Sequence, residues 1–393
     1  MSKAKKPSYN MLGITAVFFM IGMMGTRPLV SLFGNELAAS TIEIGLIVSM
    51  FPFLSLLFAV QIGRLVDRIG CKVPLIWSSL FGSVSLMIPV AFPNLSGLFA
   101  SQILAGLSTT LFVVSAQSYA GHTDEPSKRE QNVMKFSIGA AIGSFVGPLA
   151  GGYLADWIGT PRSFFLLGGI ALLAVLFSFF LIENGKPIES EREKEKPKLS
   201  ATLQLLKISN VRRAFLISSL ILLGKDMFTS YFPLLAVEFG LSSTSIGIIV
   251  ALNALAGIFI RWVMPQLIDR FGRNVVIVGS VVSSGVLFLM LPFFHHDFVL
   301  GLLSFLLGMG LGIGQPLSIS TTLSSLPQER IAEGLGLRLT ANRLTQTTAP
   351  FVFGMIAHLF GLSSVFFITG AIIVAGSAKT RIRMEGIERN AIG

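Results

Sequence analysis

The chain has 393 residues, of which 52% are hydrophobic and only 13% are Asp, Glu, Lys or Arg. Soluble globular domains contain about a quarter charged residues, so a chain this poor in charge cannot cover a surface that faces water. The composition therefore excludes an ordinary soluble protein and predicts a polytopic membrane protein with lipid around its outer face.

The formal net charge of +10 could indicate binding to nucleic acid. However, most Lys and Arg residues fall in the two tails and in alternate connections between apolar segments, while Arg162 lies in an opposite connection. This asymmetry is the positive-inside pattern, and it predicts a multi-pass protein of the cell membrane with both termini in the cytoplasm. The charge therefore sets orientation, and no nucleic-acid partner is expected.

A membrane-spanning helix needs roughly 20 predominantly apolar residues. Twelve segments meet this requirement, and in chain order they are 10–33, 43–63, 74–92, 96–120, 134–155, 162–182, 212–236, 244–264, 274–293, 298–324, 334–357 and 362–378. The polar, highly charged segment 183–211 between the sixth and seventh is expected to be a solvated cytoplasmic linker. The sequence thus predicts an all-α membrane protein with one six-helix bundle in 1–182 and another in 212–393.

The two predicted bundles are related by an internal repeat with an offset of 202 residues. The pairs that coincide under this offset are Ile44-Gly45 with Ile246-Gly247, Asp67-Arg68 with Asp269-Arg270, Gly106 with Gly308, Pro148 with Pro350, Gly152 with Gly354 and Gly159 with Gly361. Because each half has six spans, both halves start on the same side, so the repeat is parallel, with a pseudo-twofold axis along the membrane normal. Two such bundles around a central site predict a monomeric transporter that works by alternating access.

The segment "GRLVDRIGCK" at 63–72 gathers charge between the second and third spans. It resembles the signature loop of the major facilitator superfamily, and the residues that carry the resemblance are Gly63, Asp67, Arg68 and Gly70, repeated in the second half as Asp269, Arg270 and Gly272. The resemblance covers essentially the whole chain and implies two pseudo-symmetric bundles with spans 1, 4, 7 and 10 lining a cavity. It also implies that these residues form a cytoplasmic clasp, a reversible contact between the two halves.

The fifth span contains "GPLAGG" at 147–152, preceded by Gly139 and Gly143. Glycines at every fourth position allow another helix to approach closely, and Pro148 is expected to bend the helix. The segment resembles the motif of the drug:proton antiporter branch, so Gly147, Pro148 and Gly151 are predicted to take part in gating and the resemblance favours export. One departure from that branch is Gln102, which stands where its fourth span usually carries an arginine.

Ionisable residues within the spans are functional candidates because they are costly in lipid. Asp226 lies near the middle of the seventh span and is predicted to couple transport to protons, or to form a fixed ion pair with Lys225 or Arg343; both interpretations stay open. A guanidinium binds carboxylate or phosphate through two hydrogen bonds, which suggests an anionic or zwitterionic substrate. The predicted substrate-binding residues are Arg27, Gln102, Lys225, Asp226, Gln315, Asn342 and Arg343. Arg261 is instead expected to extend toward the cytoplasmic surface, and for Arg338 this is one of several interpretations that stay open.

Several other chemistries are not expected. No phosphate-binding "GxxxxGK[ST]", HExxH or GxSxG motif occurs, so neither ATP nor another cofactor is predicted, and the protein is not expected to be an enzyme. His295-His296-Asp297 reads as a solvated loop without a metal, and the single Cys71 excludes an internal disulfide.

The predicted function is a proton-coupled exporter of a small amphipathic, anionic or zwitterionic solute, such as a metal-chelating metabolite or a drug. The alternatives are a proton-coupled importer of an anionic nutrient and a membrane receptor that transports nothing. Small-molecule substrate and membrane lipid are the expected partners.

Overall fold

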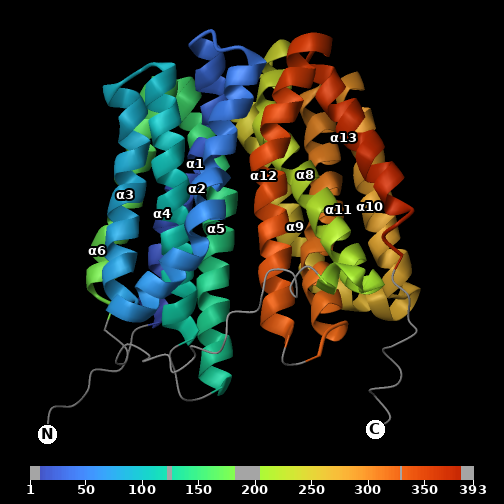
Figure 1. Ribbon diagram of the computed structural model, residues 1–393. Coiled ribbons are helices and arrows are strands. Elements are labelled where there is room, and N and C mark those ends of the chain that lie inside the picture. The colour runs from blue at the N-terminus through green and yellow to red at the C-terminus, as the bar shows by residue number, and fades with distance from the viewer. Residues whose placement is uncertain (1–8, 122–125, 182–203, 328–329, 382–393) are drawn as a thin grey trace, which may run out of the picture. The chain divides into compact units, whose positions relative to one another are not determined.

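The computed structural model describes residues 9–121, 126–181, 204–327 and 330–381, and in these ranges it contains twelve α-helices (Figure 1). The first six are α1 (Tyr9–Glu36), α2 (Thr41–Ile69), α3 (Lys72–Ala91), α4 (Leu95–Gly121), α5 (Pro126–Ile158) and α6 (Thr160–Phe179). The others are α8 (Ser209–Glu238), α9 (Ser243–Phe271), α10 (Arg273–Met290), α11 (Asp297–Ser324), α12 (Ile331–Phe360) and α13 (Leu362–Ser377). Two short 3-10 segments, η1 (Gln204–Lys207) and η2 (Leu291–Phe293), complete the described secondary structure. The all-α prediction is confirmed.

The internal repeat is visible in the positions of the helices and turns. Helices α2 and α9 are displaced from each other by 202 residues at both ends. The residues with positive φ form three pairs with the same displacement: Ala38 with Gly240, Gly70 with Gly272, and Gly159 with Gly361. These positions end one helix before the next begins, and glycine takes this backbone conformation without steric cost. The same turns therefore separate the helices in both halves.

Contacts divide the chain into two compact units. The first comprises Met1–Arg192 together with Ala236–Ala251, and the second comprises Glu193–Leu235 and Leu252–Gly393. In the first unit α3 packs on α4 and α6, and in the second the corresponding helix α10 packs on α11 and α13. The division at 183–211 expected from the sequence lies largely outside the described residues and stays a prediction.

One pair of close helix contacts recurs in both units. A Cβ atom on Gly106 of α4 would collide with the carbonyl oxygen of Phe51 in α2. A Cβ atom on Gly308 of α11 would collide in the same way with the carbonyl oxygen of Asn253 in α9, 202 residues further along the chain. The backbones of each pair therefore approach more closely than any residue with a side chain would allow.

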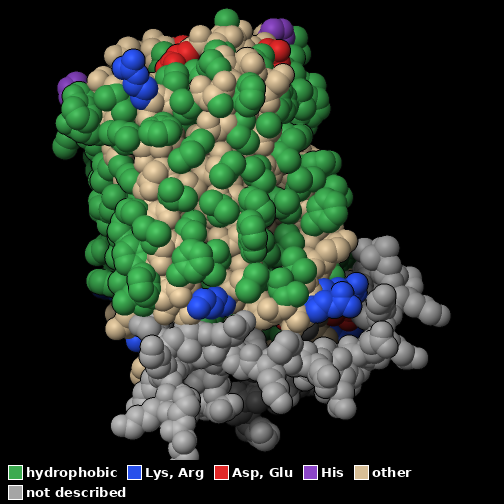
Figure 2. All heavy atoms as spheres, turned by 90° about the vertical axis from the view of Figure 1, so that its left-hand side faces the viewer, with side chains coloured by type: hydrophobic (Ala, Val, Ile, Leu, Met, Phe, Trp, Pro, Cys, Tyr) green, Lys and Arg blue, Asp and Glu red, His purple; other side chains and the backbone are tan. Residues whose placement is uncertain are grey.

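Ten of the helices are long and apolar enough to cross a membrane. Helix α13 is apolar but has 16 residues, and α12 is less apolar than the ten and carries Arg338, Asn342 and Arg343. The face of the first unit in Figure 2 is covered by hydrophobic side chains along its middle, and charged side chains gather near its ends. Trp77 and Phe165 are among the large hydrophobic side chains that are exposed in the structure, as expected for a surface that faces lipid.

The predicted loop at 63–72 is mostly helical in the structure. Helix α2 continues to Ile69, so that the turn to α3 consists of Gly70 and Cys71 only. Helix α9 likewise continues to Phe271 before Gly272. The sequence prediction ended these helices early because the apolar run stops there, whereas a helix that emerges from lipid can continue with polar residues at its surface.

Candidate substrate and coupling site

Asp226 and Arg343 both lie in the second unit, where Asp226 is buried and Arg343 is half-buried. Asp226 is the eighteenth residue of α8 and is 7% exposed. Arg343 is in α12, where its Nη1 donates a hydrogen bond to Oε1 of Gln346 at 3.1 Å. The Asp226 carboxylate acts electrostatically on the Arg343 guanidinium. The structure thus places a buried carboxyl group within electrostatic range of a half-buried guanidinium from another helix, which suits either a proton-coupling site or a fixed ion pair.

A second polar cluster connects α8, α11 and α12 closer to the beginning of α12. Nη1 of Arg338 donates hydrogen bonds to Oγ of Ser218 at 3.0 Å and to Oε1 of Gln315 at 3.1 Å. The Ser218 hydroxyl donates to Oδ1 of Asn342 at 2.7 Å. Ser218 is fully buried, and Arg338 and Asn342 are 8% and 4% exposed. Two predicted binding residues, Gln315 and Asn342, therefore lie together with an arginine that was not predicted to bind.

The burial of Arg338 decides between interpretations that the sequence left open. Its position one turn into the eleventh span allowed a side chain that extends to the cytoplasmic surface. Instead it is buried and makes hydrogen bonds to neighbouring helices. Arg261, by contrast, is exposed, as expected. The sequence signal that Arg338 faces other helices was its spacing from Asn342, because residues four apart share one face of α12.

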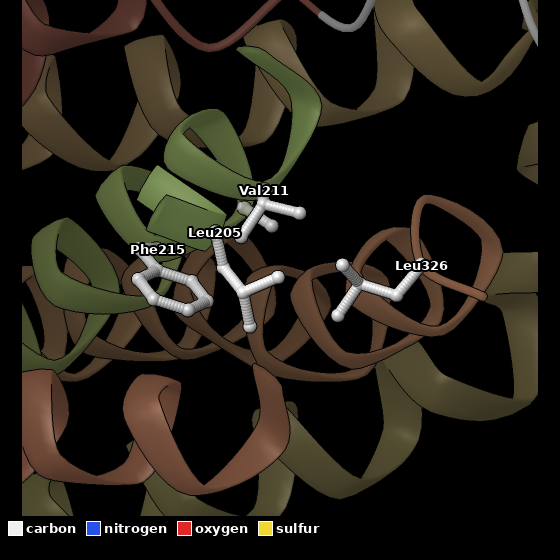
Figure 3. Packing of buried hydrophobic residues seen from close by; sticks show 5 residues of the cluster. Leu205, Val211, Phe215 and Leu326 are labelled. Carbon is white, nitrogen blue, oxygen red and sulfur yellow. The ribbon is translucent and has the colours of Figure 1, made fainter. Parts of the chain in front are cut away.

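An apolar cluster lies beside these polar residues in the second unit. It contains Leu205 of η1, Val211 and Phe215 of α8, and Leu326 after α11, all buried (Figure 3). Leu337 of α12 packs against the same cluster. Ser218 lies about one turn after Phe215 in α8, so the polar cluster is adjacent to the apolar cluster.

The first unit contains two of the predicted binding residues. The guanidinium of Arg27 in α1 lies over the aromatic ring of Phe51 in α2, 4.2 Å from its centroid. Such a cation–π contact stabilises a positive charge away from water. Gln102 in α4 is 2% exposed, and its Oε1 accepts no hydrogen bond from the described residues. Lys225 of the second unit is exposed although its neighbour Asp226 is buried, as expected of adjacent residues on a helix.

The glycine stripe of α5 does allow a close helix approach, and the partner is α1. Glycines 139, 143, 147 and 151 face the α1 backbone from residue 13 to residue 25, and a Cβ on Gly147 would lie 2.7 Å from the backbone nitrogen of Gly25. Gly152 instead faces Gly247 of α9. Pro148 lies within α5, which continues through it. A gating role for this motif stays a prediction.

The charged residues of the signature loops lie at the surface of their own units. Asp67, Arg68, Asp269 and Arg270 are all exposed. Gly63 is in open surroundings, with no heavy atom within 4 Å of a built Cβ. The clasp between the halves therefore stays a prediction.

Arg273, the residue after Gly272, binds within the second unit. Its Nη2 donates to the carbonyl oxygen of Leu317 at 3.2 Å and to Oγ1 of Thr321 at 2.8 Å. This arginine therefore connects α10 to α11. The corresponding residue of the first half, Cys71, is buried at the start of α3.

Asp156 is a residue that sequence reasoning missed. Its carboxylate accepts hydrogen bonds from the backbone N–H groups of Ser243 at 3.0 Å and Thr244 at 2.7 Å, the first two residues of α9. A carboxylate at this position satisfies donors that have no partner within the helix and complements the helix dipole. Asp156 follows Gly152 by four residues, and this spacing is the sequence signal that places both on one face of α5.

Replacing Asp156 with alanine is expected to lower the free energy of unfolding by about 1–2 kcal/mol, because two charge-assisted hydrogen bonds to α9 are lost. Hydrogen exchange at the amides of Ser243 and Thr244 should become faster, while Asp156→Asn, which keeps an acceptor, should recover part of the protection. Unchanged exchange in the alanine variant would contradict the capping role.

Groups of three or more His, Cys, Asp or Glu side chains that could hold a metal ion are absent from the described part of the chain. His295 and His296 are exposed, and Nδ1 of His296 accepts a hydrogen bond from the backbone N–H of Phe298 at the start of α11. His296 thus caps a helix.

Comparison with known proteins places these features in a family. The sequence model of the Major Facilitator Superfamily matches residues 12–344 and 214–382. The chain belongs to the major facilitator superfamily. It is 22% identical over 391 residues to an uncharacterised MFS-type transporter of Methanocaldococcus jannaschii, with 98% of this chain and 100% of that protein covered. It is 28% identical over 323 residues to a homologue of the multidrug resistance efflux pump PmrA of Lactococcus lactis, with 80% and 78% covered.

Solved structures support the same superfamily fold. A mutant of the nucleoside transporter NupG superposes with a TM-score of 0.81 at 13% identity, covering 94% of this chain and 98% of that one. A bacterial homologue of the human lysosomal transporter Spinster gives a TM-score of 0.76 at 12% identity, covering 95% and 93%. The predicted twelve-helix facilitator fold is confirmed. This member of the superfamily is a multi-pass membrane transporter of small molecules that works by alternating access, and it is not an enzyme.

Proposed function

We propose that the chain is a proton-coupled exporter of a small amphipathic solute with an anionic or zwitterionic group. The observation that carries this proposal is the pair of Asp226 and Arg343 within the helices of the second unit. A carboxylate buried next to one arginine can change its protonation when the arginine moves or meets an anion, and such a change is what links proton flow to transport.

Two further features support export of an amphipathic solute. Relatives that cover most of the chain are named as multidrug resistance proteins, among them a Bacillus subtilis protein that is 24% identical over 344 residues. In the second unit Arg338 is buried and Arg343 is half-buried, and Asp226 is the buried acid among the described residues there. An excess of positive charge within this unit is stabilised by a negatively charged group on the solute. The gating roles assigned to the two signature loops and to the α5 motif belong to the same proposal.

The proposed orientation places both termini in the cytoplasm of a cell with the protein in its plasma or inner membrane, as a monomer. The basic residues at the beginnings of α3 and α8, including Lys72 and Arg212, would then face the cytoplasm. Proton is the proposed coupling ion.

Transport by the unmodified protein tests the proposal. Inside-out proteoliposomes that are acidified inside are expected to accumulate an amphipathic anion or zwitterion, and a protonophore should abolish the accumulation. Accumulation in right-side-out vesicles under an inward proton gradient would indicate an importer instead. Binding without movement in either orientation would indicate a receptor.

A further inference from the structure

The cluster around Arg338 has a charge that its neighbours do not balance. Both described hydrogen bonds of the guanidinium use Nη1, and both acceptors, Ser218 and Gln315, are neutral. Nε of Arg338 is buried and has no hydrogen-bond partner in the described residues. Among the described residues Arg338 forms no ion pair with a carboxylate. A charge that is 92% buried is costly unless an opposite charge or a full set of hydrogen bonds compensates it.

The unused donors of Arg338 have the geometry of an anion site. A guanidinium has five N–H donors in a fixed plane. With Nη1 bound to protein oxygens, Nε and Nη2 form an edge whose parallel N–H bonds match the two oxygens of a carboxylate or phosphate. The hydrogen bonds from Nη1 fix the plane of the guanidinium, so that this edge is oriented before an anion arrives.

The surroundings limit what can bind there. Asn342 lies one helical turn from Arg338 on α12 and is hydrogen-bonded to Ser218, so its amide nitrogen is available as a further donor. The apolar cluster of Leu205, Val211, Phe215 and Leu326 lies next to the polar group. Along α8, Asp226 follows Ser218 by eight residues, or about 12 Å. The site therefore suits a solute with one oxyanion and an apolar body.

We propose that Arg338 is the residue that binds the oxyanion of the transported solute, with Gln315 and Asn342 as its polar neighbours. This inference rests on the proposed function, because it identifies the substrate class of that site as amphipathic monoanions with a carboxylate or phosphate group. Arg338 is distinct from the coupling pair: it binds the solute, and Asp226 exchanges the proton.

Binding of three matched probes tests the assignment without any gradient. They are 4-phenylbutyrate, 4-phenylbutanamide and (4-phenylbutyl)trimethylammonium, which share one apolar body and carry charges of −1, 0 and +1. Isothermal titration of the purified full chain in neutral detergent is expected to rank the anion first. Arg338→Gln should weaken binding of the anion at least tenfold and change binding of the amide less than twofold. Arg338→Lys should give an intermediate loss, because it keeps the charge without the planar fork.

Controls separate this role from structural damage. Arg261→Gln removes an equal charge from an exposed position of α9 and should leave all three affinities unchanged. Gln315→Glu places a carboxylate next to Arg338 without a change in size, so it should also weaken the anion selectively. This variant keeps the test decisive if Arg338→Gln does not fold.

Three results would overturn the assignment. The first is an equal loss of affinity for all three probes in the Arg338 and Gln315 variants, and the second is no loss of affinity in any variant. The third is displacement of phenylbutyrate by phosphatidylglycerol, which would show that a lipid headgroup occupies the site. Because binding is measured without a proton gradient, selective anion binding by a protein that fails to export would refute the proposed function and leave this inference intact.

Discussion

Asp226→Asn is expected to remove gradient-driven transport, reducing accumulation at least tenfold, while exchange of solute across the membrane without a gradient continues. Asparagine keeps the size of the side chain and one acceptor oxygen but has no proton to exchange. The measurement is solute accumulation in proteoliposomes with and without an imposed pH difference. Full gradient-driven transport by the variant would refute the coupling role.

A matched variant on the same helix is the control for Asp226. Glu238→Gln removes one negative charge from the exposed end of α8 and should leave transport unchanged. A loss in both variants would indicate an effect of charge on the protein as a whole.

The double variant Asp226→Asn/Arg343→Gln separates coupling from a fixed ion pair. Removal of one partner is expected to lower stability, by up to about 3 kcal/mol for the buried Asp226 carboxylate, because the other charge then stays uncompensated. Removal of both is expected to restore most of the stability, measured by thermal unfolding in detergent, but not gradient-driven transport. If the double variant recovers both the stability and the gradient-driven transport, the pair is structural.

Gly106→Ala and Gly308→Ala are each expected to prevent normal folding, with a cost of about 3 kcal/mol or more. Each added methyl group would collide with a backbone carbonyl of the neighbouring helix, at Phe51 or Asn253, and a backbone cannot move aside as a flexible side chain can. Helices α2 and α4, or α9 and α11, would have to separate. Yield of monodisperse protein and the unfolding temperature measure the effect.

Gly169→Ala and Gly279→Ala are the controls for these contacts. Both glycines lie in helices, and a Cβ at either meets nothing within 4 Å. Alanine there should be neutral or stabilising by up to about 1 kcal/mol, since it favours the helical state. Comparable damage at all four positions would show that close contact is not the cause.

The helices could be predicted from the sequence because a segment surrounded by lipid must consist of predominantly apolar residues. Most bounds agree within a few residues, and the offset of 202 anticipated the matched ends of α2 and α9. The extensions of these two helices beyond 63 and 264 escaped prediction, because a helix that leaves the membrane no longer needs apolar residues. Helix α12 was predicted at 334–357 although it carries several polar residues, among them Arg338, Asn342 and Arg343.

The site was predictable in its residue types but not in its partners. The residue types predicted charge within the spans: Asp226 is buried and Arg343 is half-buried, and their functional roles stay predictions. The burial of Arg338 was not predictable, because distance along a helix does not reveal whether a neighbouring helix covers the side chain. Ser218 was not considered, because a lone serine in an apolar run carries no signal until Gln315 and Asn342 are seen beside it.

The duplicated turns and glycine contacts show in what respect the two halves of this protein differ. Under the offset of 202, Gly106 coincides with Gly308, but Asp226 falls on Met24, Arg338 on Phe136 and Arg343 on Ala141. A hypothetical chain assembled from two copies of the first half would retain the turns and the close helix contacts. It would have no carboxylate or guanidinium at the positions of Asp226, Arg338 and Arg343. The turns and close helix contacts are thus repeated in both halves, whereas the positions of Asp226, Arg338 and Arg343 carry charge in the second half only.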